Sequence, residues 1–167
     1  DQYQNTRHNI GFSILDHIAS KNECLWESKK LANHTVLKKK GRQFILIKPT
    51  TFMNRSGKAV RYWALKENIP LENILILTDE IHLPFGTLRI KAKGSPAGHN
   101  GLKDIQEKLN TQQYARFRFG VGANYSRGRQ VDFVLGEWNK QETSELIERL
   151  PTSAKIITSF GTAGLAN

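Results

Sequence analysis

The run 74–77, Ile-Leu-Ile-Leu, constrains the fold more than any other segment of this chain. Four consecutive large apolar residues predict a β-strand that is covered on both faces, as in a sheet with helices packed on either side. The run ends in Thr78, Asp79 and Glu80, so acidic side chains follow directly on the buried strand. If that strand is parallel, its carboxyl end lies where open α/β folds bind their ligands. The segment therefore predicts an α/β fold with a functional edge at Asp79.

Hydrophobic spacing places the other elements around this strand. Helical periodicity predicts helices over residues 8–21, 56–67 and around 102–109. Apolar or alternating stretches predict strands at 35–37, 44–47, 87–91 and 116–121, and the basic stretch 38–42 should be a hairpin tip. Asn139 with Glu142 predicts a capping box for a last helical region, which Pro151 should kink or split. Together these elements predict a single domain over 1–167, a three-layer α/β/α sandwich around a mixed, mostly parallel sheet.

Charge and cysteine content bound the function. The chain has 25 Lys and Arg against 15 Asp and Glu, a formal net charge of +10. This excess predicts attraction to polyanions such as RNA, with salt-sensitive association. The single Cys24 excludes an internal disulfide framework and suits the cytoplasm. No apolar run approaches the roughly 20 residues that span a bilayer, so no membrane partner is expected.

His8 and Asp79 are the candidate catalytic pair. His8 falls in the first turn of the opening helix, where the positive end of the helix dipole should keep the imidazole neutral, as a general base requires. A carboxylate at Asp79 could accept the other ring N–H and stabilise the protonated ring. The alternatives are a capping or surface histidine and a turn aspartate before Leu83 and Pro84.

Amides and cations supply further candidates. Asn54 and Asn100 each precede a predicted helix and could hold a substrate carbonyl, although plain helix capping explains either one alone. Arg116 and Arg118 share one face of a strand and Lys91 and Lys93 end another. With an RNA partner these four become candidates for phosphate contacts, and otherwise they form a solvated face. Histidine spacing shows no zinc pattern and no nucleotide phosphate loop is present, so no metal or cofactor is expected.

Taken jointly, five segments resemble the bacterial peptidyl-tRNA hydrolase family, in that family's order and over essentially the whole chain. They are 3–12 (YQNTRHNIGF), 48–57 (KPTTFMNRSG), Asp79-Glu80 before Leu83-Pro84, 98–103 (GHNGLK) and 132–136 (DFVLG). The resemblance implies hydrolysis of the ester between a peptide and the terminal ribose of tRNA, by a monomer in the cytoplasm. His8 would be the general base that activates water, and Asp79 would orient and stabilise it.

The resemblance also implies which residues hold the substrate. The peptide end, the terminal nucleotide and the tRNA 3′ end would be contacted by Tyr3, Phe52, Met53, Asn54, His99 and Asn100. A tRNA phosphate would be clamped by Lys91 and Arg118, with Lys93 and Arg116 as further candidates.

The chain departs from the family pattern in three places. A strand and a Gly-Asn-Pro-Gly-like turn normally precede Tyr3, so we expect the sheet to lack a strand that is usually central. His82 stands where an acidic residue is common, and residues 93–97 replace a more Gly-rich lid. The alternatives to the hydrolase are a non-catalytic RNA-binding protein on the same fold and, more distantly, a nucleotide-binding module. Retention of His8 together with Asp79 favours the enzyme.

Overall fold

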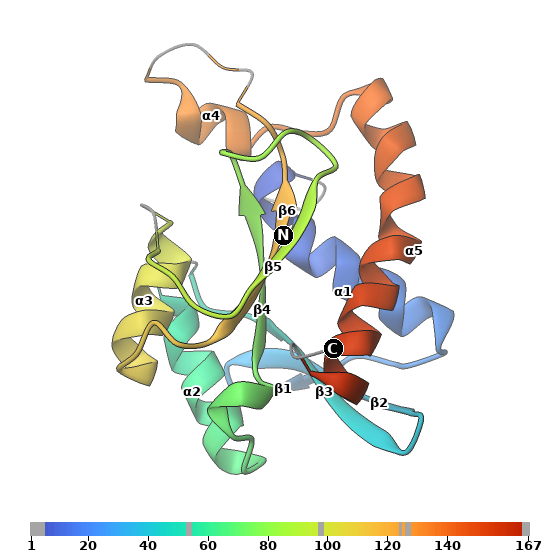
Figure 1. The fold of residues 1–167 in the computed structure, drawn as a ribbon, viewed down its shortest axis with the longest axis vertical. Coiled ribbons are helices and arrows are strands. Elements are labelled where there is room, and N and C mark those ends of the chain that lie inside the picture. The colour runs from blue at the N-terminus through green and yellow to red at the C-terminus, as the bar shows by residue number, and fades with distance from the viewer. Residues whose placement is uncertain (1–5, 53–54, 97–98, 124, 126–127, 165–167) are drawn as a thin grey trace.

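The computed structural model describes residues 6–52, 55–96, 99–123, 125 and 128–164. Figure 1 shows strands between two pairs of helices. Helices α1 (Ile10–Lys21) and α5 (Lys140–Ala163) lie on one side, and α2 (Ser56–Lys66) and α3 (Asn100–Leu109) lie on the other. The predicted three-layer α/β/α arrangement in one domain is confirmed.

The described strands form two three-stranded sheets. The first is antiparallel, in the order β1 (Glu27–Lys29), β2 (Ala32–Lys39) and β3 (Arg42–Pro49). The second is mixed, in the order β4 (Leu75–Glu80), β6 (Ala115–Gly120) and β5 (Leu88–Lys91).

Only one of the described strand pairs is parallel, that of β4 with β6. The prediction of a mixed sheet is therefore confirmed, although the described strand pairs are mostly antiparallel. The turn between β2 and β3 shows why. Lys40 and Gly41 both have positive φ, 51° and 73°, which favours a two-residue hairpin turn that joins antiparallel neighbours.

Hydrophobic clusters on both faces of β4 explain its continuous apolar sequence. Leu75 and Leu77 pack on the side of α1 and α5, against a core that includes Ile14 and Phe117. Ile76 packs on the opposite side, with a smaller cluster that links α2 and α3. Leu75, Ile76 and Leu77 are partly buried, so each contributes less than the roughly 1.5–3 kcal/mol of a fully buried side chain of this size. The expectation of a strand covered on both faces is confirmed. Because this packing fixes the position of β4, it also fixes the position of Asp79 near the end of that strand.

The edge of β4 opposite β6 lines an apolar cavity of about 780 Å³. Residues of β3, including Phe44 and Ile47, line the same cavity, as do residues of α1, α2, α3 and α5. Among the described strands β4 pairs only with β6, and β3 only with β2. A cavity therefore lies between the two described sheets.

Several elements differ from the sequence-based expectations. The helix expected at 8–21 begins as a 3₁₀ turn, η1 (Arg7–Asn9), and α1 follows it. Short elements that the sequence did not reveal are β1, η3 (Leu71–Asn73) and α4 (Gln130–Val134). Among the described residues, no helix combines the length and apolar character that crossing a bilayer requires.

Helix α5 confirms the predicted capping box and excludes one of the two effects expected of Pro151. The capping box is present, because Asn139 Oδ1 accepts from the Glu142 amide at 2.8 Å and the Glu142 side chain accepts from the Asn139 amide at 3.0 Å. Pro151 does not split the helix. The carbonyl that Pro151 cannot bond is that of Ile147, and both residues are exposed, so water can satisfy that group.

Candidate active site

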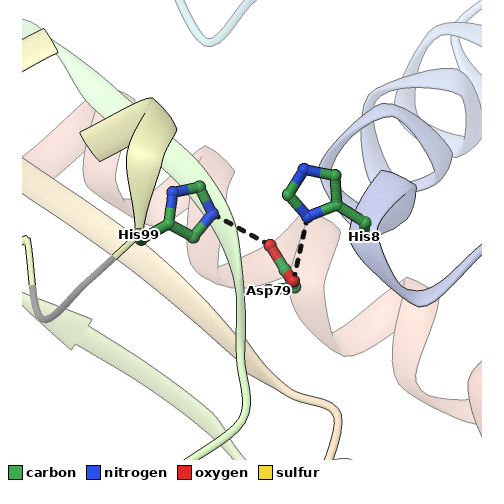
Figure 2. A group of neighbouring side chains, drawn as sticks. All are labelled: His8, Asp79 and His99. Atoms are coloured by element: carbon green, nitrogen blue, oxygen red, sulfur yellow. Dashed lines mark hydrogen bonds and ion pairs between the residues drawn. The ribbon is translucent and has the colours of Figure 1, made fainter. Parts of the chain in front are cut away.

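Three side chains from distant parts of the chain meet at the carboxyl end of β4 (Figure 2). His8 comes from η1, Asp79 from β4, and His99 from the residue that precedes α3. Asp79 lies between the two imidazoles, with its Oδ2 atom 3.2 Å from Nδ1 of His8 and its Oδ1 atom 3.0 Å from Nε2 of His99. Asp79 is only 8% exposed, so the two rings replace most of the water that would solvate its charge.

The contact with Asp79 fixes the state of His8. A carboxylate oxygen only accepts, so Nδ1 of His8 carries the proton and donates it to Asp79. The other ring nitrogen, Nε2, points away from Asp79 in Figure 2. Its lone pair is therefore the basic site of the ring, which is the tautomer that a general base needs.

The buried carboxylate and the imidazoles shift each other's protonation. Burial alone would raise the pKa of Asp79, but the hydrogen bonds from His8 and His99 outweigh burial and hold the pKa at about 2. Burial lowers the pKa of His8, yet the hydrogen bond and charge of Asp79 prevail and raise it above its usual value. From the sequence we expect a helix N-terminus to disfavour the imidazolium, whereas the carboxylate in direct contact favours it and sets the direction of the pKa shift.

A glycine lets the segment that carries His8 approach Asp79. At Gly11, in the first turn of α1, an added Cβ atom would lie 3.0 Å from the Leu77 carbonyl oxygen and 3.3 Å from the Leu77 Cβ atom. Any other residue would force α1 away from β4 by a few tenths of an ångström. Close packing of α1 on β4 therefore sets the distance between His8 and Asp79.

Arg7 anchors the turn that carries His8 to the C-terminal part of the chain. Its guanidinium donates to both carboxylate oxygens of Glu142, at 2.7 and 3.2 Å, and to the Phe133 carbonyl at 3.0 Å. It also stacks on the Phe133 ring, 4.3 Å from the centroid, and the Arg7 amide bonds the Gly136 carbonyl. Sequence reasoning missed this role, although Arg7 and 132–136 both lay in segments it had singled out.

The other proposed substrate contacts differ in their surroundings. Phe52 is 78% exposed, so its ring is available to a partner. Asn100, the first residue of α3, is also exposed. His99, which we expected to contact substrate, instead lies against Asp79 with both ring nitrogens bonded. Tyr3, Met53 and Asn54 lie outside the described residues.

The four candidate phosphate contacts divide into two kinds. Lys91 and Lys93 are exposed and line a shallow surface hollow together with Thr111, Gln112 and Gln113. Arg118 is partly exposed, with Nη1 3.4 Å from Glu80 Oε1.

Arg116 is only 2% exposed. It donates to the carbonyls of Ser95 and Gln112 and stacks on Tyr114. Its guanidinium therefore holds neighbouring loops together, and this placement does not favour a phosphate contact.

The same three side chains are of the types that ligate metal ions. His8, Asp79 and His99 offer three ligand atoms within 4.8 Å of one another, and two imidazoles with one carboxylate is a known metal-binding set. A ligating His99 would need its Nε2 lone pair free and its proton on Nδ1. Nδ1 of His99 already accepts a hydrogen bond from the Leu102 amide, so this group does not fit a metal ion.

Comparison with known proteins points to one family. A family model described as peptidyl-tRNA hydrolase matches residues 1–167. A peptidyl-tRNA hydrolase of Phocaeicola vulgatus is 53% identical over 166 residues, 99% of this chain and 89% of that protein. One of Bacteroides fragilis is 55% identical over 164 residues, 98% of this chain and 88% of that protein. The crystal structure of the Acinetobacter baumannii peptidyl-tRNA hydrolase superposes with a TM-score of 0.92 at 28% identity, covering 99% of this chain and 85% of that chain.

Proposed function

The chain belongs to the peptidyl-tRNA hydrolase family, and we propose that it cleaves the ester bond of peptidyl-tRNA with a water molecule activated by His8. The observation that carries this mechanism is the contact between Nδ1 of His8 and the buried Asp79, at 3.2 Å, which leaves Nε2 of His8 as the base. A single general base can suffice for ester hydrolysis, because water attacks the carbonyl directly and the ribose alkoxide is a good leaving group. No covalent intermediate with the enzyme is needed. A positioned general base contributes roughly 10²–10⁴-fold to such a rate.

The reaction proceeds by attack of water on the ester carbonyl. Nε2 of His8 takes one proton from the water as its oxygen bonds the carbonyl carbon, which gives a tetrahedral intermediate with negative charge on the former carbonyl oxygen. The intermediate collapses by breaking the bond to the ribose oxygen, and Nε2 returns the proton to that oxygen. The products are the peptide carboxylic acid, which ionises in water, and tRNA with a free ribose hydroxyl. Asp79 stabilises the imidazolium that exists between the two steps.

The amide and aromatic groups would position the substrate. Side-chain N–H groups of Asn54 and Asn100 would donate to the carbonyl oxygen as its charge develops. The exposed ring of Phe52 would stack on the terminal base, at about 1–3 kcal/mol per stacked base. Tyr3 would also contact the 3′ end of the tRNA, and Met53 would pack behind the bound substrate.

The basic groups near β5 and β6 would bind the tRNA backbone. Lys91, Lys93 and Arg118 remain candidates for a phosphate contact, since all three reach solvent. The net charge of +10 supports long-range attraction of the whole tRNA. We further propose that the protein acts as a monomer in the cytoplasm. A substrate made by translation supports the location.

Release of N-acetyl-aminoacyl groups from tRNA tests the mechanism directly. His8→Ala should lower kcat by roughly 10²–10⁴-fold while the dissociation constant for tRNA stays within about threefold, because the ring contacts no phosphate in this proposal. His17→Ala, in the helix α1 that follows the turn carrying His8, is the matched control and should keep full turnover. If His8→Ala retains most of its activity, the proposed mechanism is wrong. If the unaltered chain binds tRNA and never cleaves the ester, a non-catalytic RNA-binding role replaces it.

A further inference from the structure

The two ring nitrogens of His99 have different and fixed hydrogen-bond roles. His99 is the N-cap residue of α3, and its Nδ1 atom accepts from the backbone amide of Leu102 at 3.2 Å. A backbone amide can only donate, so Nδ1 of His99 carries no proton. The neutral ring then has its proton on Nε2, which lies 3.0 Å from Oδ1 of Asp79. His99 is therefore a hydrogen-bond donor to Asp79 and neither a base nor a metal ligand.

This donor determines which part of Asp79 is left for His8. Each carboxylate oxygen receives one imidazole, Oδ1 from His99 and Oδ2 from His8. A carboxylate bonded at both oxygens has no freedom to rotate about its last side-chain torsion without losing a bond. Charge-assisted hydrogen bonds of this kind are roughly twice as strong as neutral ones, so the bond from His99 is a substantial restraint.

We propose that His99 is a positioning residue, which fixes the Asp79 carboxylate through its Nε2–H donor and so directs Oδ2 at His8. The inference rests on the proposed function, because the orientation of Asp79 affects the rate only if His8 is the base. It also gives α3 a second part in the site. The helix that begins with Asn100, a proposed substrate contact, is capped by the side chain that holds the catalytic carboxylate.

The tautomer is the first test and needs no variant. Nitrogen-15 shifts of the imidazoles in the unaltered chain should show His99 protonated at Nε2 and unprotonated at Nδ1, and neutral His8 protonated at Nδ1. The opposite tautomer of His99 would overturn the inference whatever the catalytic rates are.

Two substitutions then separate the capping role of His99 from its donor role. Asparagine is among the most favoured N-cap residues, but its side chain is too short to replace Nε2 of histidine at Asp79. His99→Asn should therefore keep the melting temperature, whereas His99→Leu, which supplies neither cap nor donor, should lower it. Both should lower kcat about tenfold, the scale of one charge-assisted hydrogen bond, with KM nearly unchanged. The value of kcat should therefore depend on the Nε2–H donor, and the melting temperature should depend on the N-cap.

The titration of His8 supplies a readout that a purely structural role does not move. Among the described residues, the ionisable groups that face His8 from other elements are Asp79 and His99. Without the donor at Oδ1, the carboxylate binds the His8 imidazolium more strongly, so the midpoint of His8 and the acid limb of the kcat profile should both move to higher pH in His99→Asn.

Three further results would overturn the inference. They are normal kcat in His99→Asn, a rise in KM with kcat unchanged, which indicates a substrate contact, and an unmoved His8 midpoint. Failure of the proposed function looks different, because it appears as turnover that survives His8→Ala.

Discussion

The site has two walls, one formed by η1 and α1, which carries His8, and one formed by α3, which His99 precedes. Both walls place an imidazole against Asp79, yet the two imidazoles do different chemistry. On the wall formed by η1 and α1, His8 uses one nitrogen for Asp79, and the other has no hydrogen-bond partner among the described residues. On the α3 wall, the second nitrogen of His99 is occupied by a backbone amide. The difference teaches that the backbone partner of a histidine, more than the histidine itself, decides whether the ring is a base or a fixed donor.

The walls also differ in what holds them. Arg7 ties the His8 turn to Glu142 through two hydrogen bonds to a carboxylate. The α3 wall is tied to α2 by the Gly57 amide, which donates to the buried Asp104 carboxylate at 2.7 Å. Gly57 allows this contact because an added Cβ atom would lie 2.5 Å from the Asp104 carbonyl oxygen. One wall thus rests on an ion pair between two side chains and the other on a hydrogen bond from a backbone amide to a buried carboxylate.

Asp79→Asn removes the carboxylate to which both His8 and His99 donate, so it should have the largest effect. A neutral amide has a single acceptor oxygen, so His8 and His99 can no longer both donate, and the imidazolium loses its counter-charge. We expect kcat to fall roughly 10²–10³-fold with tRNA binding retained.

The sign of the pH effect follows from the causes of the shift. Asp79 raises the pKa of His8 against the lowering effect of burial, so removing its charge lowers that pKa. Because the neutral ring is the active form, the remaining activity of Asp79→Asn should persist to lower pH than that of the unaltered chain. A kcat profile with an unmoved acid limb would show that the pair does not act as a unit.

The sequence predicted the shared group better than it predicted the walls. Continuous apolar residues before Asp79 located the strand and its functional end, because burial on both faces leaves a direct pattern. The role of His99 as a cap left no such pattern, since histidine is not a favoured N-cap residue. Arg7 and Glu142 are 135 positions apart, and a long-range ion pair has no local signature.

Arg116 and Arg118 illustrate a second limit of sequence reasoning. Strand alternation placed both arginines on one face, and the register agrees, with Arg116 opposite Lys91 and Arg118 opposite Arg89. Alternation does not say what covers a face. Carbonyls of Ser95 and Gln112 cover Arg116, whereas Arg118 reaches solvent.

Arg7→Gln sharpens the comparison by loosening the α1 wall alone. The variant loses the charge-assisted bonds to Glu142, and we expect the free energy of unfolding to fall by about 1–3 kcal/mol. Because His8 adjoins Arg7, kcat should fall about three- to tenfold with KM unchanged.

Arg129→Gln is the matched control for Arg7→Gln. It removes one positive charge from an ion pair with Asp132 in which both side chains are about two-thirds exposed, and exposed pairs contribute little. Denaturant unfolding and steady-state rates compare the two variants. Equal effects in both would mean that Arg7 is no special anchor of His8.

The smallest effect should come from Arg118→Ala, which separates affinity from the chemistry of the walls. Loss of one phosphate contact should reduce the slope of log K against log salt concentration for tRNA binding by about one, with kcat at saturating substrate unchanged. Lys39→Ala on the β2–β3 hairpin removes the same charge far from β6 and should leave the slope almost unaltered. Equal slopes for the two variants would mean that only net charge matters. A fall in kcat instead would mean that Arg118, through its contact with Glu80 next to Asp79, belongs to the catalytic end of β4 and not to the binding surface.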